Sequence, residues 1–419
     1  MSTAANKRGV VVAHPLGNQF VRHLTHALVA KGMLAEYCTC IDWRPGPLAK
    51  RLWPDGVRAE MQRRSYPEIP ASLVASRPFR EFMRLVAGRV GLSALTRHET
   101  GALSVDAICR DFDRWVARRL PGEVGGGIVY AYEDAAAATF AVGQRLGWTR
   151  AYDLPIAYWE AGHRLLAEEA ERWPQWEFTL ESTRNSPAKL ERKTRELALA
   201  DLVICPSRFV AESLPAEARA GKQVVIAPFG SPAVRLEKPA RSPGGKLRVL
   251  FAGAMTQRKG LADLFAAMRL LRRSDVELVV LGSPILAPEF YRQEYPEFAY
   301  ERPRPHEAVL ELMATCDVFC LPSIVEGRAL VIQEALSTGL PAIVTANTGA
   351  SDAVENGVSG FVVPIRSPAA IAEQIEWFAT HRALLPDFAR AARAAAARFT
   401  WSDYAGIVLQ ALGRAGTNL

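Results

Sequence analysis

The sequence predicts an α/β protein built from two doubly wound domains, each a parallel sheet with helices on both faces. The chain has 419 residues, more than one hydrophobic core ordinarily holds, so two domains of about 150–220 residues are expected. Short apolar runs alternate with helical patterns along the chain, which is typical of βαβ units. A stretch rich in proline and glycine at 230–245 separates two series of such runs and is interpreted as a linker.

The first series of apolar runs predicts four strands of an N-terminal sheet. Their limits are 9–13, 128–132, 202–205 and 224–227. The region 44–113 shows no clear alternation and is predicted to be mostly helical. We therefore place an N-terminal domain at 1–229 and the linker at 230–246.

The second series predicts a C-terminal sheet of five strands. Their limits are 248–252, 276–281, 318–321, 341–345 and 360–363. Apolar residues between the first two of these strands recur at helical spacing and should face the sheet. They are Leu261, Leu264, Phe265, Met268 and Leu271. A second domain is predicted at 247–398, and a C-terminal helix within 399–419 is expected to pack back towards the first domain.

Composition narrows the class of protein and its compartment. Apolar residues make up 49% of the chain and charges of both signs are mixed, so a disordered protein is excluded. No apolar run is long enough to cross a membrane, and the first strand begins too early to leave room for a signal peptide. Six scattered cysteines match no zinc or redox spacing and are expected to be buried thiols. A cytoplasmic protein is predicted.

Positive charge is concentrated in one segment. Between Arg44 and Arg97 there are eleven Lys and Arg against four acids, a balance that equals the whole net charge of +7. Apolar side chains interleave with the arginines from Phe79 to Leu95. One interpretation is a basic amphipathic helix that lies on an anionic membrane surface; the other is a core-facing helix with a solvated arginine face. Nucleic acid is not an expected partner, because no reader motif accompanies the charge.

Two glutamates eight residues apart carry the strongest functional signal. Glu326 lies in a glycine-containing turn after the strand 318–321, and Glu334 lies inside a helix that begins near Arg328. The first amides of a helix lack intrahelical partners and form an anion site. Acids on both sides of an anion site suit a ligand with hydroxyls at both ends and phosphate between them. The pattern predicts a nucleotide sugar.

Cations follow the first strand of the second domain. Gly253 ends that strand and permits a ligand to approach the backbone. Arg258 and Lys259 come just before the next helix. Fixed cations at this point would stabilise the charge that builds up on a diphosphate leaving group.

With these motifs in order, the chain resembles glycosyltransferase family 4, retaining enzymes with the two-domain GT-B fold. The resemblance covers about 200–363 well and the N-terminal half only in outline. Its motifs are Ala200-Asp201-x-x-Ile204-x-Pro206-Ser207, Gly253 with Lys259-Gly260, Glu326 and Glu334 within Pro-Ser-x-x-Glu-Gly, Thr338-Gly339-Leu340-Pro341, and Asn356-Gly357-x-x-Gly360-Phe361.

The resemblance implies a role for each matching residue. Glu334 would bind the ribose hydroxyls, Glu326 would lie by the hydroxyls of the transferred sugar, and Arg258 and Lys259 would hold the diphosphate. The remaining donor-binding residues are implied by position: Gly17 in a loop after the first strand, Gly253, the loop 302–305 with Arg304 near the nucleobase, Gly327, and the amides around Ala329 and Leu330.

Two departures leave the acceptor end open. Many relatives carry an arginine where this chain has Ala254, so Arg258 would have to supply that charge. Many also have a histidine after the fourth strand of the first domain, where this chain reads Tyr130-Ala131-Tyr132-Glu133-Asp134. His163 is a candidate for sugar or acceptor contact, or else a loop histidine, and the same holds for His14. Asp153 and Glu160 would orient an acceptor hydroxyl or serve at the surface or as caps. Aromatic residues between 148 and 176 would form an acceptor platform or simply pack.

The resemblance implies transfer of a sugar, with retention, from a UDP- or GDP-sugar to a hydroxyl of a glycan or lipid-linked acceptor. Cell-envelope or exopolysaccharide synthesis is the expected setting, with peripheral membrane attachment through 44–97. In the family's account a departing phosphate oxygen takes the acceptor proton, so no metal or other cofactor is expected. The alternatives are a non-catalytic partner subunit that binds nucleotide or glycan, and a phosphorylase or synthase on the same fold.

Overall fold

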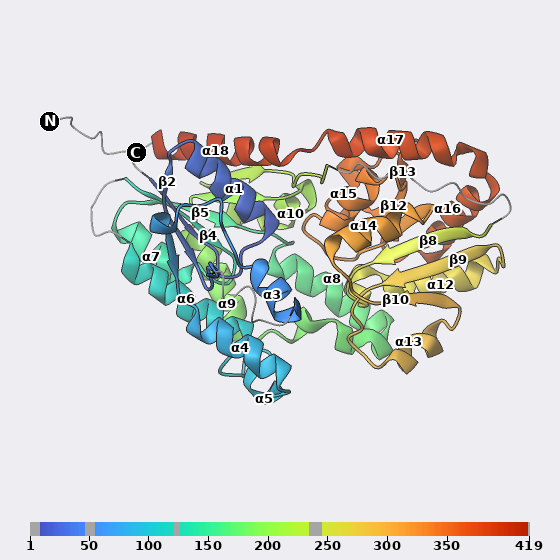
Figure 1. Ribbon diagram of the computed structural model, residues 1–419, viewed down its shortest axis with the longest axis horizontal. Coiled ribbons are helices and arrows are strands. Elements are labelled where there is room, and N and C mark those ends of the chain that lie inside the picture. Colours follow the sequence, from blue (N-terminus) through green and yellow to red (C-terminus); the bar gives the residue numbers. More distant parts are fainter. Residues whose placement is uncertain (1–8, 47–54, 121–125, 234–244, 418–419) are drawn as a thin grey trace.

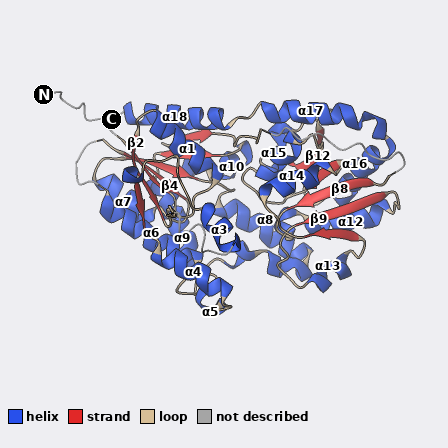
Figure 2. Ribbon diagram, in the orientation of Figure 1, coloured by secondary structure: helices blue, strands red, loops and turns tan. Residues whose placement is uncertain are grey.

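The computed structural model describes residues 9–46, 55–120, 126–233 and 245–417 (Figure 1). Two parallel sheets, one from each half of the chain, lie side by side, and helices surround both (Figure 2). The α/β, doubly wound prediction is therefore confirmed.

The first sheet has seven parallel strands in the order β3-β2-β1-β4-β5-β6-β7. Their bounds are β1 Val10–Ala13, β2 Leu34–Thr39, β3 Val74–Ser76, β4 Ile128–Tyr132, β5 Thr149–Asp153, β6 Leu202–Cys205 and β7 Gln223–Ile226. The four predicted strands are present, but β2, β3 and β5 were missed. The strand order reverses between β1 and β4, which makes the carboxyl ends of these two strands a place where such sheets bind ligands.

The second sheet has six parallel strands in the order β10-β9-β8-β11-β12-β13. Their bounds are β8 Leu247–Ala252, β9 Val276–Leu281, β10 Phe298–Glu301, β11 Val318–Leu321, β12 Ala342–Thr345 and β13 Gly360–Val363. All five predicted strands form, and β10, a partly exposed edge strand, is an addition. Here the order reverses between β8 and β11.

The helices that cover the sheets follow the apolar periodicity of the sequence. Those of the first half are α1 Gln19–Ala30, α3 Asp55–Gln62, α4 Phe79–Arg89, α5 Ser93–Thr96, α6 Val105–Arg119, α7 Ala137–Arg145, α8 Trp159–Arg172, α9 Pro187–Leu199, α10 Arg208–Ser213 and α11 Ala216–Arg219. Those of the second half are α12 Leu261–Leu271, α13 Pro288–Glu294, α14 His306–Ala314, α15 Leu330–Ser337, α16 Pro368–Thr380, α17 Leu385–Ala397 and α18 Trp401–Thr417. The predicted apolar face of α12 is buried except for Leu271, which is partly buried.

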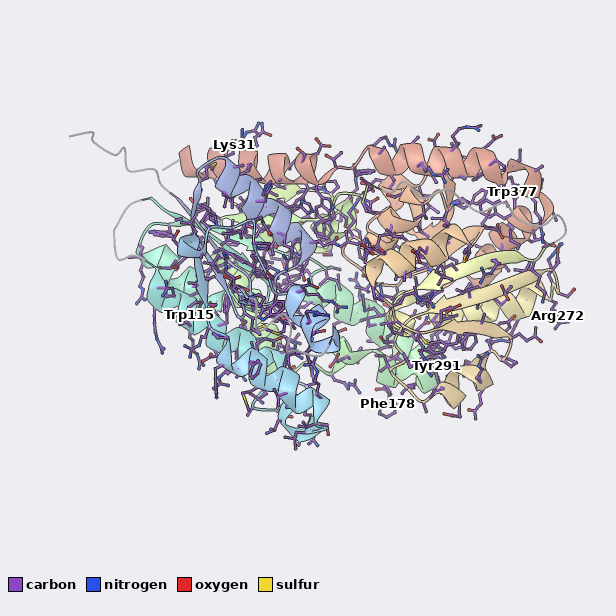
Figure 3. All side chains as sticks on the ribbon, in the orientation of Figure 1. Lys31, Trp115, Phe178, Arg272, Tyr291 and Trp377 are labelled. Atoms are coloured by element: carbon purple, nitrogen blue, oxygen red, sulfur yellow. The ribbon has the colours of Figure 1, made fainter. Side chains whose placement is uncertain are left out.

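Two segments cross between the halves of the molecule. On α18, Tyr404, Val408 and Leu412 are buried in the core beside the first sheet, so the end of the chain returns to the first half. Trp176, which follows α8, is fully buried in the core of the second half against Tyr291 (labelled in Figure 3). We retain 1–229, 247–398 and 399–419 as proposed domain limits. Most of the proposed linker, 234–244, lies outside the described residues.

Burial distinguishes the two roles predicted for the aromatic residues between 148 and 176, an acceptor platform or packing. Trp148, Tyr152, Tyr158 and Trp176 are all buried in hydrophobic cores, so they pack the protein and form no acceptor platform. Trp159, in the same stretch, is partly exposed and lines a small cavity.

The six cysteines are buried free thiols, as predicted. Among the described residues, no helix is both long and apolar enough to cross a bilayer.

Candidate active site

Two glycines open the space at the carboxyl ends of β8 and β9. Gly253 has φ 152°, and a Cβ placed there would lie 2.7 Å from Cδ of Lys259. A Cβ on Gly282, directly after β9, would lie 1.8 Å from the carbonyl oxygen of Gly253. Only glycine at these two positions lets the Lys259 side chain and a ligand approach the ends of the strands.

Glu326 joins both predicted cations at this edge of the sheet. Its Oε1 accepts a hydrogen bond from Nζ of Lys259 at 2.7 Å and lies 2.9 Å from Nη1 of Arg258. Arg258 also donates to the carbonyl oxygen of Val325 at 3.0 Å. Burial tends to raise the pKa of Glu326, but Lys259 and Arg258 outweigh it and hold the pKa below its usual range. The site therefore holds one carboxylate against two cations.

The turn that carries Glu326 is pressed against the first half of the chain. A Cβ on Gly327 would lie 1.6 Å from the carbonyl oxygen of Pro155. Ser207 donates a hydrogen bond to the Gly327 carbonyl oxygen at 2.6 Å and also caps α10 by accepting from the Val210 amide. The Pro206-Ser207 motif thus positions the Glu326 turn from across the interface.

Arg328 is a residue of this site that the sequence analysis missed. Its side chain is fully buried, and Nη1 donates to the Gly349 carbonyl oxygen at 2.9 Å and to Asp352 at 2.8 Å. Its guanidinium lies 4.5 Å from the centre of the Phe399 ring. Nε and Nη2 have no hydrogen-bond partner within the described part of the chain. The signal in the sequence was an arginine one residue before the helix N-cap.

The helix start differs in part from the prediction. Helix α15 begins at Leu330, and the amide of its N-cap Ala329 donates to the Thr348 carbonyl oxygen at 3.1 Å. The Ala329 amide is therefore occupied and does not serve the predicted anion site, although Ala329 and Leu330 both border the cavity described next.

One cavity of about 480 Å³ lies at the β8/β11 reversal, a size typical of small-molecule sites. The predicted Arg258 and Gly327 are not among the residues that line it. The predicted residues that line it are Gly253, Lys259, Arg304, Glu326, Ala329 and Leu330. Pro303, from the predicted 302–305 loop, also lines it, and the residues that sequence reasoning did not assign to it include Phe229, Gly282, Ser283, Arg328 and Val331. Arg304, from the predicted nucleobase loop, forms an ion pair with Glu301.

Glu334 lies beside this cavity and does not line it. Its Oε1 is 3.4 Å from Nδ1 of His306 at the start of α14. Burial raises the pKa of Glu334, and His306 only partly opposes that effect. Glu334 and His306 therefore form a polar pair next to the 302–305 loop.

Gly17 and His14 lie in the first half of the chain and do not line this cavity. The Gly17 amide donates to Nδ1 of His14 at 2.9 Å, and a Cβ on Gly17 would lie 1.6 Å from the hydroxyl of Tyr66. Burial lowers the pKa of His14 to about 3, so this imidazole is neutral near pH 7. Phe20 stacks on Phe229 with ring centres 4.8 Å apart, which connects this loop to the cavity wall.

His163 borders a second, small cavity of about 80 Å³. Arg258 and Val325 line it from the second half of the chain, and Glu133 and Lys193 line it from the first. Arg258 thus lies between Glu326 and His163. Of the other acceptor candidates, Asp153 is buried, with its pKa raised by burial to about 7, and Glu160 is exposed in the first turn of α8.

A larger cavity of about 1050 Å³ lies elsewhere, between α6, α7 and α9. Arginines dominate its lining, and none of the predicted site residues belongs to it. Convergence of the predicted residues, more than size, identifies the cavity at the β8/β11 reversal as the candidate active site.

Solved structures share the complete architecture. Sucrose-phosphate synthase from Thermosynechococcus elongatus matches with a TM-score of 0.60 at 18% identity, over 97% of this chain and 98% of that one. A glycosyltransferase from Rickettsia africae ESF-5 matches with a TM-score of 0.63 at 14% identity, over 98% and 99%. Anabaena Alr3699/HepE, solved with UDP and glucose, gives 0.60 at 15% identity, over 97% and 100%. The protein has the GT-B fold.

Residues 235–395 match the family model described as glycosyl transferases group 1. This match confirms the resemblance drawn from the motifs; family 4 in particular remains a prediction. The D-inositol 3-phosphate glycosyltransferase of Paenarthrobacter aurescens is 30% identical over 182 residues, 41% of this chain and 45% of that protein. The putative colanic acid biosynthesis glycosyltransferase WcaL of Salmonella typhimurium is 28% identical over 154 residues, 34% and 38%. Each match spans less than half of the curated relative.

Proposed function

We propose that the protein transfers a sugar, with retention at the anomeric carbon, from a nucleoside diphosphate sugar to a hydroxyl of an acceptor. The observation that carries the proposal is the buried Glu326 carboxylate bound to Lys259 and Arg258 at the β8/β11 reversal. Diphosphate and sugar hydroxyls are the groups that such a mixed set of cations and carboxylate binds.

In this proposal the diphosphate takes hydrogen bonds from Lys259 and Arg258. Negative charge grows on the leaving phosphate as the glycosidic bond breaks, so cations already in place lower the barrier. Glu326 remains charged because its pKa is low, and it accepts hydrogen bonds from the transferred sugar. The buried Arg328 guanidinium adds positive charge at the same wall of the cavity.

The nucleoside would lie towards the 302–305 loop, with the ribose hydroxyls bound by Glu334. UDP or GDP is the proposed nucleotide; the HepE complex with UDP and glucose supports UDP as the first candidate. The acceptor would enter from the first half of the chain, where His163 lines a cavity beside Arg258. A departing phosphate oxygen would take the acceptor proton on the same face of the sugar, so no protein base is assigned.

A glycan or lipid-linked acceptor of the cell envelope is proposed, supported by the similarity to WcaL. A non-catalytic subunit is the alternative; it could keep the same ion pairs of Glu326 with Lys259 and Arg258 to bind nucleotide alone, so turnover distinguishes the two.

Thermal unfolding with UDP, GDP, ADP and dTDP, each with and without Mg²⁺, tests the proposal first. A nucleotide at about 100 times its dissociation constant stabilises the fold by about 2.7 kcal/mol. We expect one nucleotide to raise the melting temperature more than the others, and that nucleotide defines the donor sugars to assay for turnover. No shift with any of the four would contradict a competent donor site, and binding without turnover on any sugar would favour the non-catalytic subunit.

A further inference from the structure

Helices α4 and α5 expose an unusual amount of apolar surface. Phe79 is 73% exposed, Val90 is 62% exposed and Leu92 is 52% exposed. Four more large apolar side chains of the same segment are also exposed, namely Phe82, Met83, Val86 and Leu95. On α4 these residues recur every three or four positions, so they form one stripe along the helix. Figure 1 shows α4 and α5 at the outer edge of the first half of the molecule, away from the second sheet.

The opposite face of α4 is turned inward and carries both polar and apolar side chains. Glu81 is fully buried and is bound by Arg64 at 2.8 Å and by Arg84 at 2.7 Å. Ala87 is buried on the same side. Leu85 is partly buried and packs against the core of the first half. One face of α4 is therefore held against the core, and the core-facing interpretation does not account for the apolar stripe exposed on the other face.

The exposed surface of the segment carries positive charge without negative charge. Between 79 and 97 the one acid is Glu81, which is buried. Arg89 and Arg97 are exposed and form no ion pair within the described part of the chain. Arg80 lies 3.7 Å from Asp111 on α6, which ties α4 to a helix that exposes Arg114 and Arg118 as well. The apolar stripe thus lies inside a basic surface.

We infer that this apolar stripe and its arginines dock the protein on an anionic lipid bilayer. Apolar side chains gain by entering the boundary between headgroups and acyl chains, and arginines gain near anionic headgroups. A second copy of the chain suits the surface poorly, because a symmetric contact would bring the arginines of both copies together. The inference goes beyond sugar transfer and does not depend on it, since the surface lies apart from the donor cavity.

Co-sedimentation of the full chain with vesicles tests the inference without any donor or acceptor. The vesicles are phosphatidylcholine alone and phosphatidylcholine mixed with phosphatidylglycerol, at low salt. We expect binding to the mixed vesicles only, and weaker binding as salt is raised. Absence of binding to the mixed vesicles at low salt would overturn the inference.

Matched variants assign the binding to this surface. The triple variant Phe79→Ser, Phe82→Ser and Val90→Ser removes exposed side chains and should weaken vesicle binding at least about tenfold. The control triple Leu270→Ser, Val358→Ser and Leu384→Ser removes apolar side chains that are 59%, 44% and 40% exposed in the second half of the chain. Equal binding by the two triples would overturn the inference.

The arginines are tested by Arg89→Ala with Arg97→Ala, which leaves the buried Glu81 and its partners intact. Each lost arginine should weaken binding to anionic vesicles about fivefold. Sedimentation velocity of the same proteins gives an independent check. A concentration-dependent dimer that only the apolar triple abolishes, with vesicle binding unchanged, would identify this face as a contact between copies and overturn the bilayer inference.

Discussion

The two sheets of this protein reverse strand order in the same way, but the loops that follow their central strands differ. At β8/β11 a buried carboxylate binds two cations beside an open cavity. At β1/β4 the corresponding loop holds the neutral, buried His14 and is closed by Tyr66 over Gly17. Directly after β4, Glu133 forms an ion pair with Lys193 at 2.8 Å, so both reversals hold charged groups, but only the loop after β1 is neutral and closed. The proposed donor and acceptor ends of the reaction follow from that difference.

The largest effect on activity is expected for Glu326→Ala at the β8/β11 reversal. We expect turnover to fall about 100- to 1000-fold, because an interaction with the reacting sugar is lost, while nucleotide binding persists through Lys259 and Arg258. Steady-state kinetics and nucleotide titration measure the two effects separately. Glu171→Ala, at an exposed position on α8, is the control and should leave both unchanged. Normal activity of the Glu326→Ala enzyme would show that the carboxylate at the β8/β11 reversal takes no part in the reaction.

Glycine-to-alanine changes compare the backbone at the two reversals. A Cβ on Gly260 (φ 75°) would lie 2.1 Å from the Pro322 carbonyl oxygen, whereas on Gly17 (φ 64°) it would meet the Tyr66 side chain. A side chain can move and a strand-end carbonyl cannot, so Gly260→Ala should cost about 3 kcal/mol of unfolding free energy and Gly17→Ala about 2 kcal/mol.

Gly357→Ala serves as the control for these two changes. Its φ is 74° and a Cβ there would meet nothing, so only the backbone cost of about 1 kcal/mol is expected. Urea unfolding of the three variants measures the series. A cost for Gly260→Ala no greater than for Gly357→Ala would contradict the described packing of this loop.

Lys259→Met should weaken nucleotide diphosphate binding about 10- to 100-fold, the usual value of a hydrogen bond to a charged group. The exposed Lys31 on the edge of α1 offers a matched control, since Lys31→Met removes the same charge far from either reversal. Isothermal titration with the nucleotide found by thermal unfolding gives both affinities. Equal affinities would show that the diphosphate does not bind at Lys259.

The neutral state of the buried His14 should affect how the free energy of unfolding depends on pH. His14 has its pKa lowered from 6.5 to about 3, so between those values the unfolded chain binds more protons than the folded one. Stability from this group is complete above pH 6.5 and is lost as pH falls towards 3, with a slope of up to about 1.4 kcal/mol per pH unit. His14→Asn should make the slope shallower in that range, as measured by urea unfolding at several pH values. An unchanged slope would place the acid sensitivity in other groups.

Most of the second sheet and the charged part of the donor site could be predicted from the sequence, because their signals are local. Apolar runs with turn residues mark β8, β9 and β11, and the positions of Gly253, Lys259 and Glu326 relative to those strands place all three at one edge of the sheet. A strand that contains a charged residue is not an uninterrupted apolar run, and the partner that neutralises this charge can be distant in the sequence. β5 contains Arg150, which is paired with Asp201, fifty-one residues further on, and this strand was missed.

Tertiary structure alone decided the features that depend on distant partners. The Glu326 turn is held by Pro155 and Ser207 from the other half of the chain, Trp176 is buried in the second core, and Arg328 finds its partners at Gly349 and Asp352. Helix α4 shows the limit most clearly. Its sequence has an apolar stripe and several arginines. The stripe stays exposed because the helix turns its other face inward, where Glu81 is buried between Arg64 and Arg84. Periodicity determines that a helix is amphipathic, and only the surrounding structure determines which face it buries.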